Sequence, residues 1–77
     1  MKAIKKTTKA RYTPNGKMIR EYRLSKRYGL NKTAHSLKIS PTYLSFIERG
    51  KIKYVSERVA SDLAMFLNNQ IVPEKGE

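Results

Sequence analysis

The side chains most able to take part in recognition lie in one short stretch near the middle of the chain. Thr42 and Ser45 carry hydroxyl groups, which can donate to or accept from the edge of a base. Arg49, Lys51 and Lys53 follow them and carry the positive charge that binds backbone phosphates. This combination predicts contact with a nucleic acid.

Residue types needed for catalysis or metal binding are not grouped in this sequence. His35 is the single histidine, there is no cysteine, and the six acidic residues are dispersed. A zinc site or a nucleophile with its base needs several such groups together. We therefore expect no enzyme activity, no metal and no cofactor.

The positive charge is unevenly distributed along the 77 residues, which carry a formal net charge of +11. Residues 1 to 17 hold six Lys or Arg and no acid, and residues 18 to 54 hold nine against two acids. Residues 55 to 77 hold two against four. This asymmetry predicts one surface that binds a polyanion, double-stranded DNA first, although a merely solvated surface is the alternative.

The organisation expected is one small domain with short ends. Residues 1 to 12 form a basic flexible arm, residues 13 to 69 the DNA-binding domain, and residues 70 to 77 a tail. No apolar run is long enough to span a membrane. The first lysines are followed by polar residues and not by the apolar stretch of a secretory signal. We expect a cytoplasmic protein, of bacterial or phage type.

The arm lacks apolar periodicity and is expected to be mobile in isolation. Such an arm can become ordered on phosphates. A strand from Ala10 to Tyr12, leading into a turn at residues 14 to 16, is the second interpretation, since no partner strand is evident. The basic residues of the arm that we expect to contact DNA are Lys5, Lys6, Lys9 and Arg11.

A helix over residues 41 to 49 has the clearest boundaries. Ser40 is suited to the N-cap and Pro41 to the first helical position. Leu44 and Ile47 share the buried side at 100° per residue, and Gly50 can adopt the left-handed conformation that ends a helix.

Three further helices are predicted around it. One runs from about Pro14 to Arg27, with Thr13 as its cap, and one begins after Gly29 with an apolar stripe from Leu30 to Leu37. A last helix is capped by Ser56 and ends at Asn68-Asn69, and Pro73 prevents any extension. The fold class expected is all-α, with four or at most five helices.

The sequence resembles the phage Cro and repressor type of helix-turn-helix, also called the xenobiotic-response-element family. The segments that carry the resemblance are IREYR at 19 to 23, Ala34 with Leu37, IS at 39 to 40, YLS at 43 to 45 and IERGK at 47 to 51. The match covers about residues 14 to 67. It implies a compact DNA-binding domain of lambda-repressor type, and most members of the family are repressors that bind inverted repeats as dimers.

The resemblance also assigns roles to individual residues. It implies a structural ion pair between Arg23 and Glu48, which would hold the recognition helix against the first helix. The positions that face bases in the family are Pro41, Thr42, Ser45 and Phe46 in this sequence. None of the four offers a bidentate partner for adenine or guanine, so we expect specificity from hydroxyls, thymine methyl contacts and DNA shape.

Two positions depart from the family pattern. Lys38 replaces the usual glycine of the turn, so a lysine must adopt a left-handed backbone at a cost of about 1 kcal/mol or the turn has another shape. Leu30 replaces a polar residue that reaches the DNA backbone. The free amides of Gly29, Leu30 and Asn31 are then expected to bind phosphate, with Lys32 as a weaker contact.

Two aromatic residues have two interpretations each. Tyr43 is expected either to donate to a phosphate or to pack beside Leu44. Phe46 is expected to touch DNA, or instead to cover Arg49 or Lys53 or pack under the following loop.

The sequence is compatible with three functions. The first is a dimeric DNA-binding regulator, the second a protein-interaction module such as an antitoxin or adaptor, and the third a non-specific nucleic-acid binder. An apolar patch for a dimer or a protein partner is predicted near the C-terminus, with core burial of Phe66 as the alternative. Its residues are Met65, Phe66, Ile71 and Val72.

Overall fold

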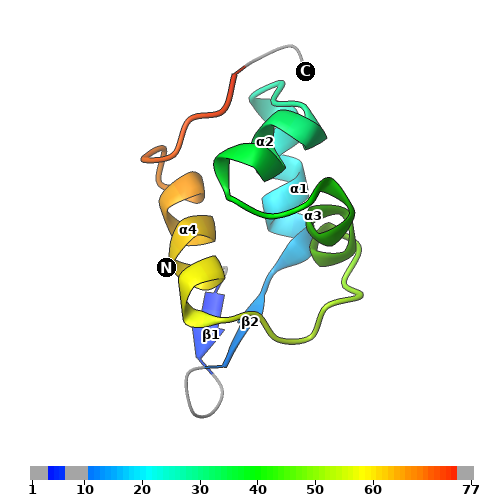
Figure 1. Cartoon of the computed structure of the whole chain (residues 1–77), viewed down its shortest axis with the longest axis vertical. Helices are drawn as coiled ribbons and strands as arrows, with labels where there is room; N and C mark the ends of the chain where they lie inside the picture. Colours follow the sequence, from blue (N-terminus) through cyan, green and yellow to red (C-terminus); the bar gives the residue numbers. More distant parts are fainter. Residues whose placement is uncertain (1–3, 7–10, 75–77) are drawn as a thin grey trace.

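Four helices and one short β-hairpin make up the described part of the computed structural model, which comprises residues 4–6 and 11–74 (Figure 1). The mostly helical fold agrees with the predicted all-α class, and no fifth helix occurs in these residues. None of the helices found there is long and apolar enough to cross a membrane. The elements are β1 Ile4–Lys6, β2 Tyr12–Pro14, α1 Gly16–Ser25, α2 Leu30–Ser36, α3 Pro41–Glu48 and α4 Glu57–Leu67.

Side-chain caps fix where the helices start. The backbone N–H of Tyr43 donates to Ser40 Oγ over 3.0 Å at the start of α3, as predicted. The backbone N–H of Val59 donates in the same way to Ser56 Oγ at the start of α4. These local bonds satisfy amides that the first turn of a helix leaves free.

The predicted start of α1 is wrong by two residues. The cap is Asn15, whose Oδ1 accepts from the backbone N–H of Met18 over 3.0 Å, and not Thr13. Thr13 and Pro14 belong instead to β2, where Pro14 pairs with Ile4. Strand pairing holds this backbone extended, so the helix begins only after Asn15.

The connections between helices use left-handed residues. Arg27 has a φ of 61°, which ends α1 at Ser25 and not at Arg27 as predicted. Lys38 also has a φ of 61°, so the lysine accepts the conformation that the family usually gives to glycine. Gly50 follows α3 with a φ of 75°, as its residue type predicted.

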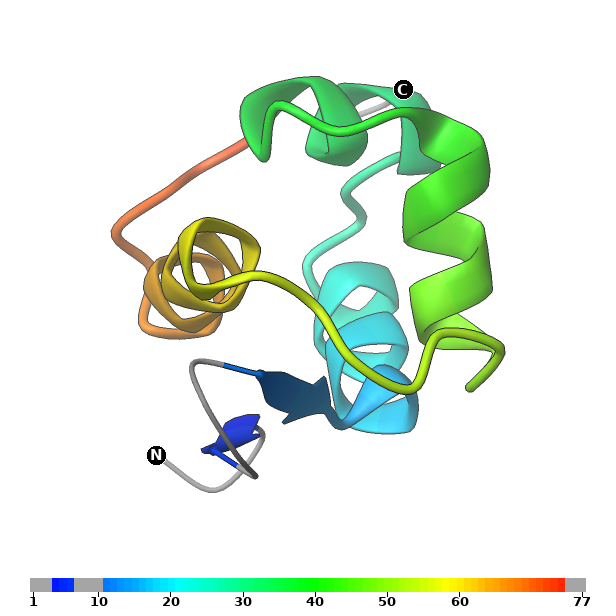
Figure 2. The same ribbon diagram turned by 60° about the horizontal axis from the view of Figure 1, so that its bottom comes forward.

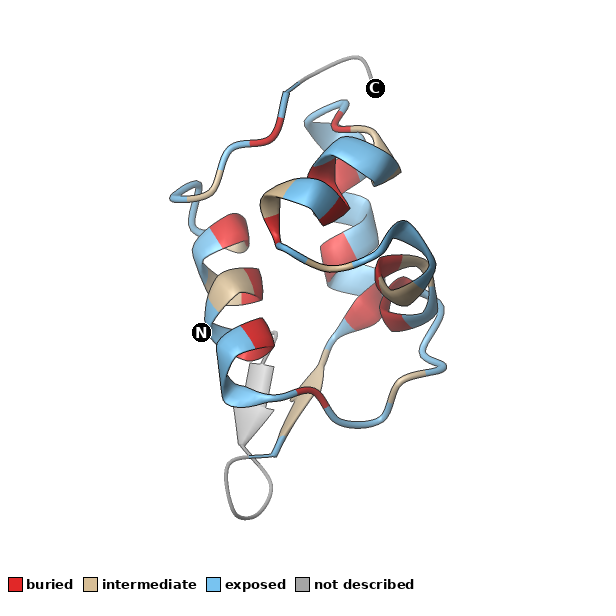
Figure 3. Ribbon diagram, in the orientation of Figure 1, coloured by how far each residue is buried: buried red, intermediate tan, exposed pale blue. Residues whose placement is uncertain are grey.

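The buried residues of the helices face the interior between them (Figure 3). Phe66 of α4 is the largest fully buried side chain. The ring of Tyr22 meets the Phe66 ring edge to face, with centroids 5.0 Å apart. Figure 2 shows α1 between α3 and α4, with α2 across one end. The other large apolar side chains that are fully buried are Ile19, Leu44, Ile47 and Leu63 from α1, α3 and α4, and Leu37, the C-cap of α2.

Two parts of the N-terminal segment are strands, whereas the first interpretation is a flexible arm. β1 pairs antiparallel with β2, and Tyr12 of β2 also forms an isolated bridge with Val55 (Figure 1). The second interpretation, a strand near Tyr12, is closer to the structure. Its partner strand is only three residues long and contains two lysines, so it left no recognisable pattern in the sequence.

Gly16 allows the start of α1 to touch the end of α3. A Cβ atom on Gly16 would lie 2.0 Å from the backbone oxygen of Ile47 and 2.9 Å from that of Glu48. Both neighbours are backbone atoms and cannot rotate away. The lack of a side chain at Gly16 is therefore what lets the two helices approach.

We predict that Gly16→Ala destabilises the fold by about 2 kcal/mol or more, because the new methyl group overlaps the α3 backbone. On helix propensity alone the same change would stabilise α1 by about 0.5–1 kcal/mol. The sign of the change in unfolding free energy, measured with urea, therefore distinguishes the two effects. Lys17→Ala, at the exposed neighbouring position, serves as the control.

Candidate nucleic-acid interface

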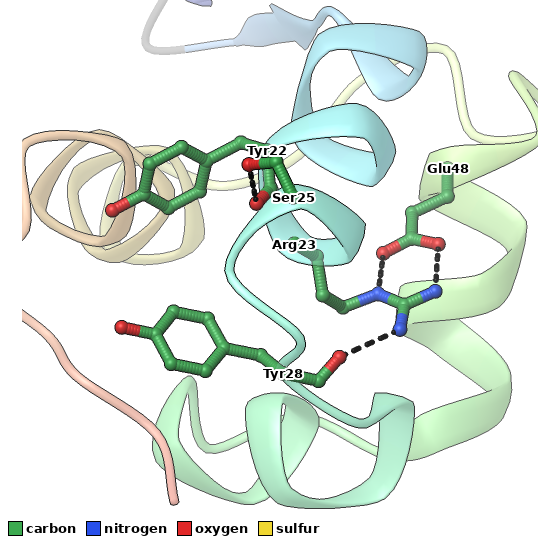
Figure 4. A network of polar contacts seen from close by, with 5 residues as sticks. All are labelled: Tyr22, Arg23, Ser25, Tyr28 and Glu48. Atoms are coloured by element: carbon green, nitrogen blue, oxygen red, sulfur yellow. Dashed lines mark hydrogen bonds and ion pairs between the residues drawn. The ribbon is translucent and has the colours of Figure 1, made fainter. Parts of the chain in front are cut away.

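A buried ion pair fixes α3 against α1 (Figure 4). Arg23 Nε donates to Glu48 Oε2 over 2.7 Å, and Nη2 donates to Oε1 over 3.0 Å. Arg23 Nη1 donates to the backbone oxygen of Tyr28 over 3.0 Å. The guanidinium group therefore joins the end of α3, the body of α1 and the connection to α2, and the pair implied by the family resemblance is present.

A second arginine, Arg58 of α4, holds the turn between α2 and α3. Its Nη1 donates to the backbone oxygen of Leu37 over 3.1 Å, and its Nη2 donates to that of Lys38 over 3.3 Å. Asp62, one helical turn further along α4, accepts from Nη1 over 2.8 Å and orients the group. Sequence reasoning missed Arg58, because only its spacing from Asp62 is visible in the sequence and the two carbonyl partners are distant.

The predicted base-facing residues lie together on the outer side of α3. Pro41, Thr42 and Phe46 are exposed, and Ser45 is partly exposed. The guanidinium carbon of Arg49 lies 5.4 Å from the centroid of the Phe46 ring. The Arg49 guanidinium thus packs over the Phe46 ring, which supports the interpretation that Phe46 packs against this arginine. Phe46 is still 38% exposed, and its contact with DNA stays a prediction.

Tyr43 is only partly exposed and packs against the core cluster. This contact supports the packing interpretation of its ring. A phosphate contact by its hydroxyl stays a prediction.

Exposed cations continue from the end of α3 into the following loop. Arg49, Lys51 and Lys53 are all exposed. The ammonium nitrogen of Lys53 lies 5.5 Å from the centroid of the Tyr54 ring, and the guanidinium carbon of Arg11 lies 5.2 Å from it. The structure therefore brings Arg11 of the predicted arm next to the loop after α3.

The remaining arm residues are described less fully. Lys5 and Lys6 lie in β1, where the backbone alone is described, and Lys9 lies outside the described residues. Their contacts with DNA stay predictions.

The start of α2 offers less to a phosphate than the sequence suggested. Gly29 is the N-cap without a side-chain bond, as predicted, and Leu30 is half-buried against the core. Lys32 is exposed, but its Nζ donates to Oε1 of Glu74 over 2.7 Å. This hydrogen bond and the charge of Lys32 hold the pKa of the Glu74 carboxyl below its usual value.

The C-terminal tail and α2 line a shallow pocket. It is bounded by Asn31, Lys32, His35, Ser36, Val72 and Glu74. Across the described part of the chain, no three His, Cys, Asp or Glu side chains are grouped closely enough to hold a metal ion.

The predicted apolar patch near the C-terminus is smaller than expected. Phe66 belongs to the core and has no exposed surface, because the side of α4 that carries it faces α1. Ile71 is half-buried against the core. Only Met65, at 37% exposure, and Val72, at 60%, remain available to a partner.

No family model, curated protein or solved structure matches this chain. The assignment to the Cro and repressor type therefore remains a resemblance, carried by the residues quoted above.

We predict that removing one partner of the buried pair, by Glu48→Leu or Arg23→Met, lowers the unfolding free energy by about 3 kcal/mol or more. The double variant Arg23→Met with Glu48→Leu should recover much of that loss, because no unpaired charge is left buried. Urea unfolding measures both effects. A double variant as unstable as the sum of the two single variants would contradict this account.

Proposed function

We propose that this protein is a sequence-specific regulator that binds double-stranded DNA, acting as a small repressor on an inverted-repeat operator as a dimer. The observation that carries the proposal is the exposed side of α3, a short capped helix followed at once by three exposed cations. α2, the turn at Lys38 and α3 have the order expected of a helix-turn-helix.

Rigid support of α3 favours a recognition role. The helix is held at its end by Arg23, and the turn before it is held by Arg58. A recognition helix must present its side chains to the DNA in a fixed orientation. The contacts of Arg23 and Arg58 would fix the orientation of α3. The interpretation as a helix of DNA-reading type therefore has a structural basis beyond the sequence resemblance.

In this proposal, base recognition and phosphate affinity come from different residues. Thr42 and Ser45 are suited to base edges, and Phe46 to thymine methyl groups or a shaped groove. Arg49, Lys51 and Lys53 are suited to phosphates, which give affinity without sequence information. With few reading groups and a net charge of +11, affinity should depend strongly on salt.

A protein-interaction module such as an antitoxin or adaptor is the second candidate. The exposed Met65 and Val72 favour it, because they offer an apolar contact away from the cations of α3. The same residues suit a homodimer. Binding that requires another protein would support this candidate over the first.

The proposal is tested by fluorescence anisotropy against a duplex selected from a random library and against its scrambled version, at two salt concentrations. We predict that Thr42→Ala with Ser45→Ala reduces the ratio of the two affinities by about tenfold, because two base contacts are lost. Ser61→Ala, on the exposed side of α4, is the matched control.

Other outcomes of this titration separate the candidates. An unchanged ratio in the Thr42 and Ser45 variant would remove these residues from the reading surface. Equal binding to every duplex and to RNA would support the non-specific binder, and no binding without a partner would support the interaction module. The mass of the free protein, measured alongside, reports whether it is a dimer.

We further predict that Glu74→Gln raises DNA affinity by about threefold at low salt, because the carboxylate that partly neutralises the Lys32 charge is removed and the attraction of this region for a phosphate increases. Glu21→Gln removes the same charge from the exposed side of α1 and controls for net charge. Equal effects of the two variants would show that Lys32 does not contact phosphate.

A further inference from the structure

The β-hairpin is attached to the segment that follows α3. The backbone N–H of Val55 donates to the oxygen of Tyr12 over 2.8 Å, and the N–H of Tyr12 donates to the oxygen of Val55 over 3.2 Å. Val55 is itself buried in the core. The loop between α3 and α4 therefore holds β2 in a fixed position beside it (Figure 2).

This attachment gathers two cations around one aromatic ring. Arg11, which precedes β2, and Lys53, which precedes the bridge, lie 5.2 Å and 5.5 Å from the centroid of Tyr54. Both distances fall within the range in which a ring attracts a cation. Tyr54 is 37% exposed, so its ring lies at the surface. The contacts with this ring restrict where the two charges lie.

The two joined segments are the most basic parts of the chain. Residues 1 to 17 carry six Lys or Arg and residues 49 to 53 carry three, and neither stretch contains an acid. Arg11 and Lys53 are like charges held on the same ring, so they repel each other. A bound polyanion relieves this repulsion.

We propose that the hairpin and the loop after α3 form a rigid wing for DNA backbone phosphates, with Arg11, Tyr54 and Lys53 at its centre. The wing would contact the duplex that flanks the segment under α3, because the loop continues directly from the end of that helix. The inference rests on the proposed function. It adds a second contact region, in which Tyr54 is a positioning residue for the two cations.

The positioning role separates this wing from a flexible basic arm. In an arm, only charge matters, and an uncharged neighbour has no effect on binding. In the wing, the ring of Tyr54 decides where both cations lie, so its loss lowers phosphate binding although no charge is removed. The tyrosine hydroxyl is not needed for that role.

The test uses the full chain and two selected duplexes, one with and one without about six extra base pairs on each flank. Anisotropy titrations over a salt series compare Arg11→Gln, Tyr54→Leu and Tyr54→Phe. Lys26→Gln is the matched control, since Lys26 lies 5.7 Å from the Tyr22 ring at the other end of α1. Thermal unfolding checks that every variant is folded.

We expect Arg11→Gln to reduce the salt slope by about 0.9 on the longer duplex. Tyr54→Leu should weaken binding by about threefold or more on that duplex, and Tyr54→Phe should bind as the wild type does. The wild type should prefer the longer duplex, and the Arg11 and Tyr54→Leu variants should lose that preference.

Two results would overturn the wing. One is Arg11→Gln and Tyr54→Leu both behaving as Lys26→Gln does, and the other is a wild type indifferent to the flanks. In either case a wild type that still prefers the selected sequence leaves the proposed function intact. A wild type that binds no duplex contradicts both proposals.

Discussion

The buried ion pair between Arg23 and Glu48 is the constraint on which the rest of the structure depends. α3 is only eight residues long and buries few large side chains, so its own packing supports it weakly. The pair adds a charged bidentate contact at its last residue, and the same guanidinium binds the carbonyl of Tyr28. Two buried charges cost desolvation energy, so the pair defines a geometry more than it supplies stability. The Arg23–Glu48 pair also needs α1 and α3 to lie close together, and the absence of a side chain at Gly16 allows this.

That fixed geometry gives α3 a surface with two parts. The outer side carries small hydroxyl groups and one phenylalanine ring, which are suited to a groove but discriminate bases weakly. The end of the helix and the loop beyond carry exposed arginine and lysine. The rings of Phe46 and Tyr54 lie beside Arg49 and Lys53, so these two exposed charges are restricted in position. Held charges bind phosphates at a smaller entropic cost than mobile ones.

The ends of the chain take part in the fold more than their composition indicates. Near the N-terminus, the Tyr12 to Val55 bridge joins a basic hairpin to the loop after α3. Near the C-terminus, Glu74 returns to Lys32 on α2, and Pro73 is buried. Both ends therefore contact regions that the sequence assigns to DNA binding, one adding positive charge and the other neutralising it. Under the proposed function, the balance of the two would set the strength of phosphate binding.

The sequence by itself determined features that depend on neighbouring residues. The caps Ser40 and Ser56 and the left-handed Gly50 follow from interactions within one turn of the chain, and the apolar stripes follow from helical periodicity. The start of α1 was misplaced because strand pairing, a long-range interaction, overrides the signal of Thr13 and Pro14. Core burial of Phe66 was one of its two sequence interpretations and is confirmed, whereas the hydrogen bonds of Arg58 to the turn before α3 and the contact of Gly16 with α3 were decided only by the tertiary structure. Each depends on which atoms of a distant segment come within hydrogen-bonding or contact distance. The residue pattern along one helix does not indicate these long-range contacts.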